Sequence, residues 1–374
     1  MRYDKIITDL REQGNLRSIP QDSNNAVVDF SLNDYLGIAE SGIVQQEFFS
    51  NPANTRIALT SSASRLLASD QKHYTNLENH IAAALGREVL LFNSGYHANT
   101  GMVSALADAS TLIVADKLVH ASIIDGIMLS KAPFTRFRHN DIAHLDRILE
   151  KESGKYERVI VIVESVYSMD GDSAPLEQIA ELKGKYGNMM LYVDEAHSFG
   201  VLGRNGMGVT TLLPHPEMVD VVIGTFGKAL GSAGAFAAMN SELRTLAINR
   251  ARSFIFSTAL PPMSCAYTLH TLKWVENHED ARTHLGILAA YLRDALKANG
   301  IKTSDDARYI TPIVIGDAKR TVEISRKLLE HGVKVLPIRT PTVLPGTERL
   351  RISLSAAMSH TDIDLLVNSL VKVL

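Results

Sequence analysis

The chain has 374 residues, of which 45% are hydrophobic and 21% charged, and its formal net charge is −3. This balance is ordinary for a globular protein. The slight acidity and the lack of a long run of like charge exclude a strongly basic surface for nucleic acid or membrane. The N-terminal stretch is charged throughout, so we expect no secretory leader.

Cys265 is the only cysteine. One thiol cannot form a disulfide within the chain, so a reducing, cytoplasmic setting is expected. We expect this thiol to pack as a small apolar side chain rather than to act as a nucleophile. The longest uncharged stretch, residues 253–272, contains Pro261 and Pro262. These prolines favour a buried loop and helix over a bilayer span.

The middle of the chain alternates short apolar runs with helical patterns. Strands are predicted at residues 88–92, 111–115, 158–164, 189–194 and 220–225. A helix over residues 176–187 separates two of them. Apolar strands that alternate with helices predict a mostly parallel sheet covered on both faces.

The region after about residue 275 has a different pattern. A long helix around residues 284–300 precedes a strand, a helix and two further strands, at 309–316, 320–332, 334–339 and 349–356. The last helix is predicted to begin at Thr361 as its N-cap. We therefore predict an α/β protein with three parts. These are an N-terminal segment over residues 1–40, a large domain over 41–275 and a smaller α+β domain over 276–374.

Ligands of open α/β sheets bind beyond the carboxyl ends of the strands, so the residues after each predicted strand are candidates for a site. Asp194 ends an apolar strand and His197 follows it closely. A helix-capping aspartate beside a packed histidine explains this pair equally well. The string Asp-Glu-Ala-His also suggests a helicase, which needs a phosphate loop. Val222 and Ala229 stand where that loop would need other residues around Lys228, so a nucleoside triphosphatase is excluded.

Ser94, Gly95 and Tyr96 lie between a predicted strand and a predicted helix. Backbone N–H groups at a helix start hold phosphate well, although many turns of this kind contain Ser-Gly without binding anything. His120 lies in the loop after the next predicted strand. Taken alone, it is read more readily as a core histidine or the neighbour of an N-cap than as a site residue.

Lys228 stands among the small residues of TFGKALGSAG, residues 225–234. A lysine usually points into solvent, so these neighbours indicate room for a ligand. Together the loops suit a phosphate group, a ring nitrogen opposite Asp194, a flat ring beside His120 and a carbonyl for Lys228. Pyridoxal 5′-phosphate (PLP) combines these features, and its enzymes use a Schiff-base lysine and an acidic partner for the ring nitrogen. We therefore predict PLP as the cofactor and no metal.

Motifs along nearly the whole chain carry a family resemblance. In chain order they are NDYLG, SRLLAS, LLFNSGYHAN, DKLVHASIIDG, RHND, VESVYSMDGDSAPL, DEAHSFGVLGRNGMG, TFGKALGSAGAF, FIFSTALPP and RLRISLSAAMSHTDID. This series resembles the α-oxoamine synthase family of fold-type I PLP-dependent enzymes. Its members condense a small amino acid with an acyl thioester and release CO2. The resemblance implies a fold-type I transferase, an acyltransferase activity and a homodimer with shared active sites.

Cofactor roles follow from the motif that each residue occupies. The resemblance implies that Lys228 bears PLP and that Asp194 pairs with the ring nitrogen. It also implies that His197 lies near the ring hydroxyl and that His120 stacks on the ring. Further cofactor contacts are implied for Ser94, Gly95, Tyr96, Ser168 and Thr225, and Ser257 and Thr258 would reach the cofactor of the second subunit.

Substrate roles are implied for four more residues. Arg351 matches the arginine that binds the amino acid carboxylate, and its planar fork suits that group. Asn33 and Thr342 match substrate-side positions, and Arg17 matches an arginine near the acyl chain. Residues 337–356 are most similar to family members that use L-alanine and a pimeloyl thioester, whether carried by CoA or by a carrier protein.

Other functions stay open at this point. A family member could use glycine or serine with another thioester, and a plain aminotransferase would not consume a thioester at all. A PLP-binding protein without turnover is disfavoured, because Lys228, Asp194 and Arg351 are all present. The family often has glycines where this chain has Ser61, Ser62 and Ala63. Since glycine alone reaches some backbone angles freely, this departure bears on acyl specificity rather than on PLP chemistry.

Overall fold

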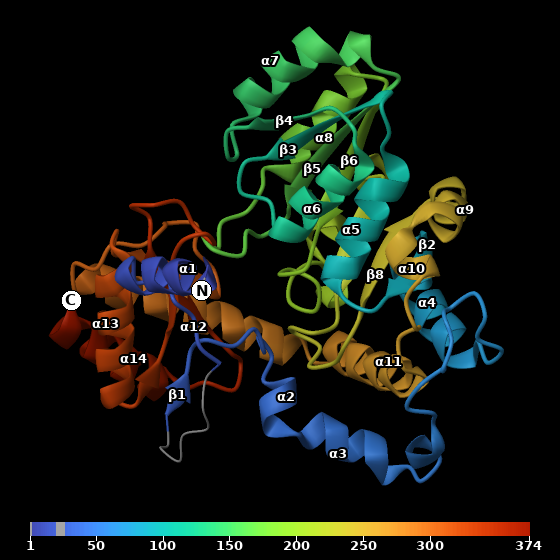
Figure 1. The fold of residues 1–374 in the computed structure, drawn as a ribbon. Coiled ribbons are helices and arrows are strands. Elements are labelled where there is room, and N and C mark those ends of the chain that lie inside the picture. Colours follow the sequence, from blue (N-terminus) through green and yellow to red (C-terminus); the bar gives the residue numbers. More distant parts are fainter. Residues whose placement is uncertain (1, 20–26) are drawn as a thin grey trace. The chain divides into compact units, whose positions relative to one another are not determined.

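The computed structural model describes residues 2–19 and 27–374 (Figure 1). The chain divides into two compact units. The large unit consists of Gly37–Tyr167 and Ser173–Glu279. The small unit consists of Met1–Leu36, Ser168–Asp172 and Asp280–Leu374. The small unit therefore combines the two ends of the chain with a short segment from the middle of the sequence.

The large unit is built on a seven-stranded sheet. β8 runs antiparallel to both of its neighbours, and the other strands run parallel to one another, so the prediction of a mostly parallel sheet is confirmed. The order across the sheet is β2 (Glu88–Phe92), β8 (Ala235–Met239), β7 (Val221–Thr225), β6 (Met189–Asp194), β5 (Arg158–Glu164), β3 (Thr111–Asp116) and β4 (Phe134–Phe137).

All five strands predicted for the large unit form with nearly the predicted bounds. Two further strands of this unit, β4 and β8, were not predicted. β8 reads AFAAM and is fully buried, but alanine has a low β propensity, so its sequence does not indicate a strand. β4 is a short edge strand with two exposed residues, so it lacks the continuous apolar run that marked the others.

Helices cover the sheet of the large unit. Their apolar residues, among them Met102, Ile123 and Ala247, pack in one core cluster with strand residues such as Ile160 and Ile223. α5 and α6 lie side by side against the sheet (Figure 1). The helices are α2 (Ile38–Ser41), α3 (Ile43–Ser50), α4 (Lys72–Leu85), α5 (Gly95–Leu106), α6 (Ala121–Ser130), α7 (Ile142–Glu152), α8 (Leu176–Lys185), α9 (Ser241–Arg250), α10 (Arg252–Ile255) and α11 (Pro262–Asn277).

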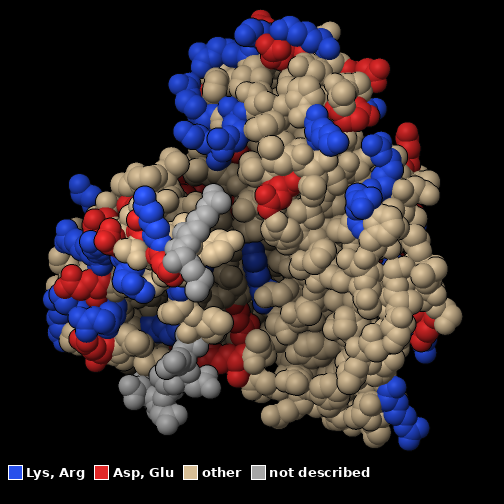
Figure 2. Space-filling model, viewed as in Figure 1, with Lys and Arg blue, Asp and Glu red and all other residues tan. Residues whose placement is uncertain are grey.

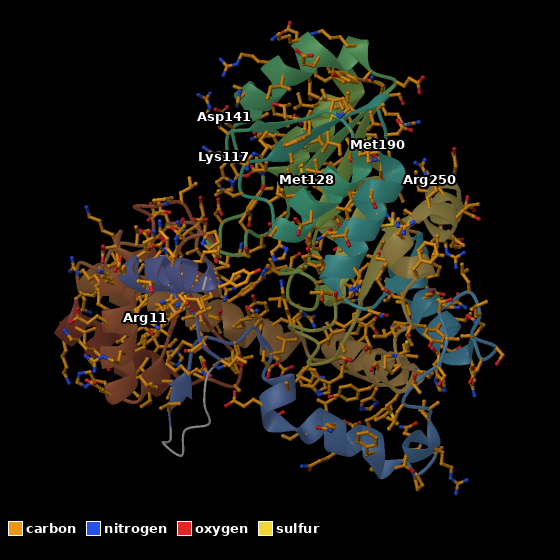
Figure 3. All side chains as sticks on the ribbon, in the orientation of Figure 1. Arg11, Lys117, Met128, Asp141, Met190 and Arg250 are labelled. Atoms are coloured by element: carbon orange, nitrogen blue, oxygen red, sulfur yellow. The ribbon has the colours of Figure 1, made fainter. Side chains whose placement is uncertain are left out.

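Local sequence explains where several of these helices begin. Asp141, labelled in Figure 3, caps α7 by accepting a hydrogen bond from the backbone N–H of His144 at 2.8 Å. Asn240 caps α9 in the same way. α11 begins at Pro262, within the uncharged stretch that was interpreted as a buried loop and helix. Proline suits the first turn of a helix because its missing N–H is not needed there.

Cys265 lies on α11 and is fully buried. Burial raises the pKa of its thiol to about 12, so the reactive thiolate is disfavoured. This confirms the interpretation of Cys265 as a packed apolar side chain. In residues 2–19 and 27–374, no helix has both the length and the apolar character that a bilayer span requires.

The small unit is an α+β assembly. Its three-stranded antiparallel sheet has the order β11 (Leu336–Ile338), β12 (Arg349–Ser353) and β9 (Ile310–Val314). A second sheet pairs β1 (Val28–Asp29) with β10 (Val333–Lys334). The helices are α1 (Arg2–Glu12), α12 (Glu279–Ala298), α13 (Ala318–Glu330) and α14 (His360–Val373).

The predicted start of the last helix is wrong. Ser359, not Thr361, is the N-cap of α14. The Ser359 hydroxyl accepts from the backbone N–H of Asp362, and the Asp362 carboxylate accepts from the backbone N–H of Ser359. This reciprocal capping box satisfies two N–H groups and starts the helix two residues before the predicted position.

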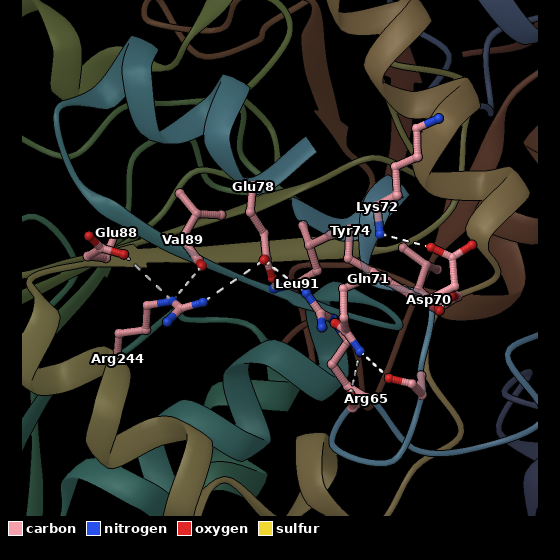
Figure 4. A network of polar contacts seen from close by, with 12 residues as sticks. Arg65, Asp70, Gln71, Lys72, Tyr74, Glu78, Glu88, Val89, Leu91 and Arg244 are labelled. Atoms are coloured by element: carbon pink, nitrogen blue, oxygen red, sulfur yellow. Dashed lines mark hydrogen bonds and ion pairs between the residues drawn. The ribbon is translucent and has the colours of Figure 1, made fainter. Parts of the chain in front are cut away.

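A buried network of ion pairs and hydrogen bonds stabilises the position of β2, the strand that precedes Ser94 (Figure 4). Glu78 on α4 forms an ion pair of 3.0 Å with Arg65, from the SRLLAS motif, and accepts from the backbone N–H of Leu91 at 3.3 Å. Arg244 lies 4.0 Å from the same carboxylate and donates to the Val89 carbonyl at 3.0 Å. Two of the five residues lie on β2, so the network holds this strand against α4 and α9.

Glu78→Ala is expected to lower the free energy of unfolding by about 3 kcal/mol, because it leaves the half-buried guanidinium of Arg65 without its counter-ion. Urea denaturation of the PLP-loaded protein, followed by circular dichroism, measures this. Glu88→Ala is the matched control, since Glu88 is exposed and contacts the same Arg244 at 3.8 Å. It should cost less than about 1 kcal/mol. Equal losses in the two variants would contradict a special role for the buried carboxylate.

Candidate functional site

Predicted cofactor residues of the large unit lie at the carboxyl ends of its parallel strands. β2, β7, β6, β5 and β3 run in the same direction. Ser94 follows β2, Asp194 ends β6 and Thr225 ends β7. The loops after these strands therefore open on one edge of the sheet, where open α/β folds bind their ligands.

Asp194 is a buried carboxylate, with only 4% of its surface exposed. Its Oδ2 accepts from the side-chain amide of Asn99 at 2.7 Å and its Oδ1 from the backbone N–H of Ala196 at 2.9 Å. In the described part of the chain, Asp194 forms no ion pair with a lysine, arginine or histidine. A buried negative charge needs compensation, so this carboxylate is set up for a cationic ligand group.

His120 is exposed and is itself the N-cap of α6, so it is neither a core histidine nor the neighbour of an N-cap. Its Nδ1 accepts from the backbone N–H of Ser122 at 3.2 Å and lies 2.8 Å from the Ser122 hydroxyl. The surrounding protein lowers the pKa of His120, and the nearby positive charge of Lys228 adds to this, while Asp194 opposes it. The ring is therefore neutral at neutral pH.

Lys228 lies in the turn between β7 and β8 and is partly buried. Its Nζ is 2.7 Å from Nε2 of His197. Backbone conformation and close packing explain why some residues of this turn are small. Gly231 and Gly234 have φ angles of 56° and 104°, which favour glycine. A side-chain carbon at Gly234 would also lie 2.6 Å from Leu260. The glycines thus shape the turn that presents the lysine.

The predicted phosphate end is a helix N-terminus. Ser94 caps α5 and accepts from the backbone N–H of His97 at 3.2 Å. A side-chain carbon placed on Gly95 would lie 3.8 Å from Cβ of Thr225, so these two predicted phosphate contacts are neighbours. Tyr96 is about half exposed, and its hydroxyl donates to Asp125 on α6. Free N–H groups and a nearby hydroxyl suit an anion.

The small unit holds a second group of predicted residues around Arg351. This guanidinium is 2% exposed. It donates to the Ser168 carbonyl at 2.6 Å, to the Ser353 hydroxyl at 2.7 Å and to the Asn33 side-chain oxygen at 3.0 Å. Among the residues that the structure describes, Arg351 has no carboxylate partner, whereas Arg349 pairs with Asp170 at 2.5 Å. Arg351 is therefore a buried cation available to an anionic ligand.

Tyr35 completes this group and was not predicted. Its hydroxyl donates to Asn33 Oδ1 at 3.1 Å and accepts from Arg351 at 3.4 Å. Burial raises the pKa of Tyr35 to about 12, so it stays a neutral donor that orients the amide of Asn33. It occurs in the NDYLG motif beside Asn33, which is the signal that could have found it.

Arg17 and Thr342 lie in contact in the small unit. Arg17 Nη2 donates to the Thr342 hydroxyl at 3.2 Å, although the two residues are 325 positions apart. Arg339 donates to the Leu16 carbonyl at 3.2 Å, and burial lowers the pKa of Arg339, with a further contribution from the positive charge of Arg17. The structure thus brings together two residues that the sequence had only aligned with substrate-side positions.

Ser257 and Thr258 lie in an exposed to half-buried loop of the large unit. The Thr258 carbonyl accepts from the side-chain amide of Asn93 at 2.7 Å, and Thr258 also forms a bridge with Ser64. These contacts fix the backbone and leave the Thr258 side chain exposed. The contact of Ser257 and Thr258 with a second subunit stays a prediction.

Residues 61–63, where the family often has glycines, include a residue with an unusual backbone conformation. Ser62 has a φ angle of 51°, a left-handed conformation that is unfavourable for residues with a side chain. Its backbone N–H donates to Thr60 Oγ1 at 3.0 Å, and Ser61 Oγ donates to the Ala63 carbonyl at 2.7 Å. The serine-rich loop therefore keeps a glycine-like turn by means of local hydrogen bonds.

Ser62→Gly is expected to raise the free energy of unfolding by about 0.5–1 kcal/mol, because relief of the left-handed strain exceeds the added entropy of the unfolded chain. Thermal denaturation measures this change. Ser61→Gly serves as the control, since it removes the 2.7 Å hydrogen bond to Ala63 and relieves no strain, so it should destabilise. A loss of stability in Ser62→Gly would show that the turn is not strained.

The residues around Asp194 and Lys228 fit PLP. The buried carboxylate without a cationic partner suits a protonated ring nitrogen, and the Lys228 amine suits the aldehyde carbon. The N-terminus of α5 beside Thr225 suits the phosphate. The neutral imidazole ring of His120 suits a flat ring as its neighbour. Each requirement of the cofactor has a matching group within the large unit.

Comparisons with known proteins agree with this geometry. The family model described as aminotransferase class I and II matches residues 25–370. A relative from Pasteurella multocida (strain Pm70), which carries the provisional name 8-amino-7-oxononanoate synthase, is 45% identical over 372 residues. The alignment covers 97% of this chain and 96% of that relative. The match extends over both units, so it is not limited to the cofactor loops.

Solved structures show the same fold. A structure described as SPT with PLP has a TM-score of 0.91 at 27% identity, with 100% of this chain and 97% of that chain covered. The 8-amino-7-oxononanoate synthase from Francisella tularensis has a TM-score of 0.78 at 28% identity, with 93% and 97% covered. These likenesses confirm the fold-type I architecture and PLP as the cofactor. The chain therefore belongs to the class I and II aminotransferase family and, within it, to the 8-amino-7-oxononanoate synthase family of PLP-dependent acyltransferases.

Proposed function

We propose that this enzyme condenses L-alanine with a pimeloyl thioester, on CoA or on a carrier protein, to give 8-amino-7-oxononanoate, the free thiol and CO2 in biotin biosynthesis. One observation carries the proposal. Two buried charges, Asp194 and Arg351, lack an opposite charge in the described chain. A cofactor ring nitrogen satisfies the first and an amino acid carboxylate satisfies the second. The relatives' names support 8-amino-7-oxononanoate as the product, and the resemblance of residues 337–356 supplies the choice of alanine and the pimeloyl group.

Residues of the large unit handle the cofactor and the proton at Cα. Bound PLP supplies an electron-withdrawing ring that stabilises negative charge on Cα of the amino acid. Lys228 would bear the cofactor, and its amine would remove the Cα proton once alanine is bound. The buried carboxylate of Asp194 would keep the ring nitrogen protonated. His197 lies 2.7 Å from the Lys228 amine and would hold this amine in place.

Residues of the small unit orient the substrates. Arg351 binds the alanine carboxylate through its planar fork, and Asn33 and Ser168 fix the guanidinium at 3.0 and 2.6 Å. Cα then forms a bond to the thioester carbonyl carbon, and the thiolate leaves with its electron pair. The carboxylate departs as CO2, and one proton is returned to Cα. Arg17 serves the acyl group, and its hydrogen-bond partner Thr342 occupies a substrate-side position.

We also propose a cytoplasmic homodimer in which Ser257 and Thr258 reach the second active site. The large unit presents a broad face with few charged side chains (Figure 2). Large apolar side chains are exposed beside the predicted contact and in the loop after residue 57, with Phe256 at 69%, Leu59 at 74% and Leu67 at 78%. Exposed apolar groups of this kind mark an interaction surface, and a second copy is the partner that the family resemblance implies.

Thiol release from pimeloyl-CoA tests the function. The PLP-loaded protein is incubated with the thioester and alanine, glycine or serine, and free thiol is measured. Alanine-dependent release, with 8-amino-7-oxononanoate identified by mass spectrometry, is the expected result. Release only with glycine or serine would keep the acyltransferase family and replace the substrate. Formation of a keto acid without thiol release would indicate an aminotransferase and overturn the proposal.

If pimeloyl-CoA gives no release, the same assay is repeated with the pimeloyl group on a carrier protein. Release from that donor alone would assign the carrier form of the substrate. No release from either donor with any of the three amino acids would overturn the proposed substrates. Residues 61–63, where this chain departs from the glycine-rich pattern, would then be the first segment to test for an effect on acyl specificity.

A further inference from the structure

A line of buried polar groups connects Asp194 to His120 within the large unit. Asn99, on α5, is 2% exposed, and its amide nitrogen donates to Asp194 Oδ2 at 2.7 Å and to the Ser122 hydroxyl at 3.0 Å. The Ser122 hydroxyl lies 2.8 Å from Nδ1 of His120. The Tyr192 hydroxyl donates to the Asn99 side-chain oxygen at 2.8 Å. No member of the line is charged apart from Asp194.

The direction of each hydrogen bond in this line is determined. If the amide of Asn99 were reversed, its oxygen would face the Asp194 carboxylate, and two acceptors would meet. Both amide hydrogens are therefore committed, one to Asp194 and one to Ser122. The backbone N–H of Ser122 donates to His120 Nδ1 at 3.2 Å, so this nitrogen acts as an acceptor. The Ser122 hydroxyl, 2.8 Å from the same nitrogen, therefore also donates to it.

Two donors at Nδ1 require a lone pair on that nitrogen, so the proton of the neutral ring is on Nε2. We propose that Asn99 is a positioning residue that orients Asp194 and, through Ser122, holds His120 in its Nε2–H tautomer. In this tautomer His120 donates a hydrogen bond from Nε2 and has no free nitrogen to accept a proton. Removal of the Cα proton is then assigned to Lys228 alone.

This inference rests on the proposed function for its catalytic meaning, but its test does not need a substrate. The expected neutral state agrees with the lowered pKa of His120. Nitrogen-15 NMR of histidine-labelled, PLP-loaded protein distinguishes the two tautomers, because protonated and unprotonated ring nitrogens have different chemical shifts. The chain has 13 histidines, so the signals of His120 are identified by their loss in His120→Asn. The expected result is an unprotonated Nδ1 and a protonated Nε2.

Asn99→Asp tests the positioning role with an almost unchanged side-chain shape. A carboxylate cannot donate, so both hydrogen bonds are lost and a second negative charge lies against Asp194. The Nε2–H tautomer should give way to a mixture, and PLP should bind about ten- to a hundredfold more weakly. Asn277→Asp is the matched control, because Asn277 is exposed at the end of α11 and bonds only the Lys273 carbonyl. It should change neither readout.

Ser122→Ala provides a smaller change if the first variant does not fold. It removes the hydroxyl donor to His120, so the Nδ1–H tautomer should become detectable while Asp194 keeps its bond from Asn99. A proton on Nδ1 of the wild-type ring would overturn the tautomer assignment. Unchanged His120 shifts in both variants would overturn the role of Asn99. Failure of alanine-dependent thiol release, with the tautomer as expected, would remove the proposed substrates and leave this inference standing.

Discussion

Replacing Lys228 by alanine is expected to reduce turnover by at least about 10³-fold, because in the proposed mechanism one amine both attaches the cofactor and removes the Cα proton. The small residues of the turn leave no second lysine in residues 225–234 to take over. In the tautomer inferred for His120, the ring has no free nitrogen to accept a proton, so it cannot act as the base. The assay is alanine-dependent thiol release from the pimeloyl thioester that the wild-type protein accepts.

A second readout separates loss of the amine from loss of the fold. Borohydride treatment of the PLP-loaded wild type should fix the cofactor to a peptide containing Lys228, which mass spectrometry detects, and the variant should lack this modification. Lys185→Ala is the control, since Lys185 is exposed and pairs with Asp146 at 2.8 Å. It should retain both the rate and the modification. Normal turnover in Lys228→Ala would remove the lysine from the mechanism.

Asp194→Asn is expected to lower kcat by about 10²- to 10³-fold, in the range of losing one preorganised electrostatic contact in an active site. The substitution keeps the shape of the side chain and removes its charge. In the proposed mechanism the ring nitrogen of bound PLP would then lose the anion that keeps it protonated, and negative charge on Cα would be stabilised less. The effect should appear in kcat more than in KM for alanine, because the alanine carboxylate is assigned to Arg351.

The absorption spectrum of bound PLP supplies an independent check of Asp194→Asn. It should change between wild type and variant, because the protonation state of the ring nitrogen alters the chromophore. Asp146→Asn, at an exposed carboxylate paired with Lys185, should leave the spectrum and the rate unchanged. A near-wild-type kcat in Asp194→Asn, with PLP still bound, would contradict the role of this carboxylate in charge stabilisation.

The difference between Asn99 and Asp194 shows where sequence reasoning stops. Asp194 could be predicted because a carboxylate at the end of an apolar strand is unusual and has to be compensated. Asn99 lies inside α5, where its neighbours give no local sign of a partner. Its partners, Tyr192, Asp194 and Ser122, are 93, 95 and 23 residues away in the chain. Only the packing of α5 against the sheet and α6 brings these groups together.

The sequence by itself determined the parallel strands, the loops that follow them and the identity of Lys228, Asp194, His120 and Arg351 as candidates. Periodicity and unusual residue types are local properties, so they can be read without contacts. Tertiary structure alone decided that β8 belongs to the sheet, because its alanines become a strand only between two paired neighbours. It also decided that Arg351 is held by the Ser168 carbonyl, 183 residues away. Contacts over such separations depend on the folded path of the chain, which no local pattern encodes.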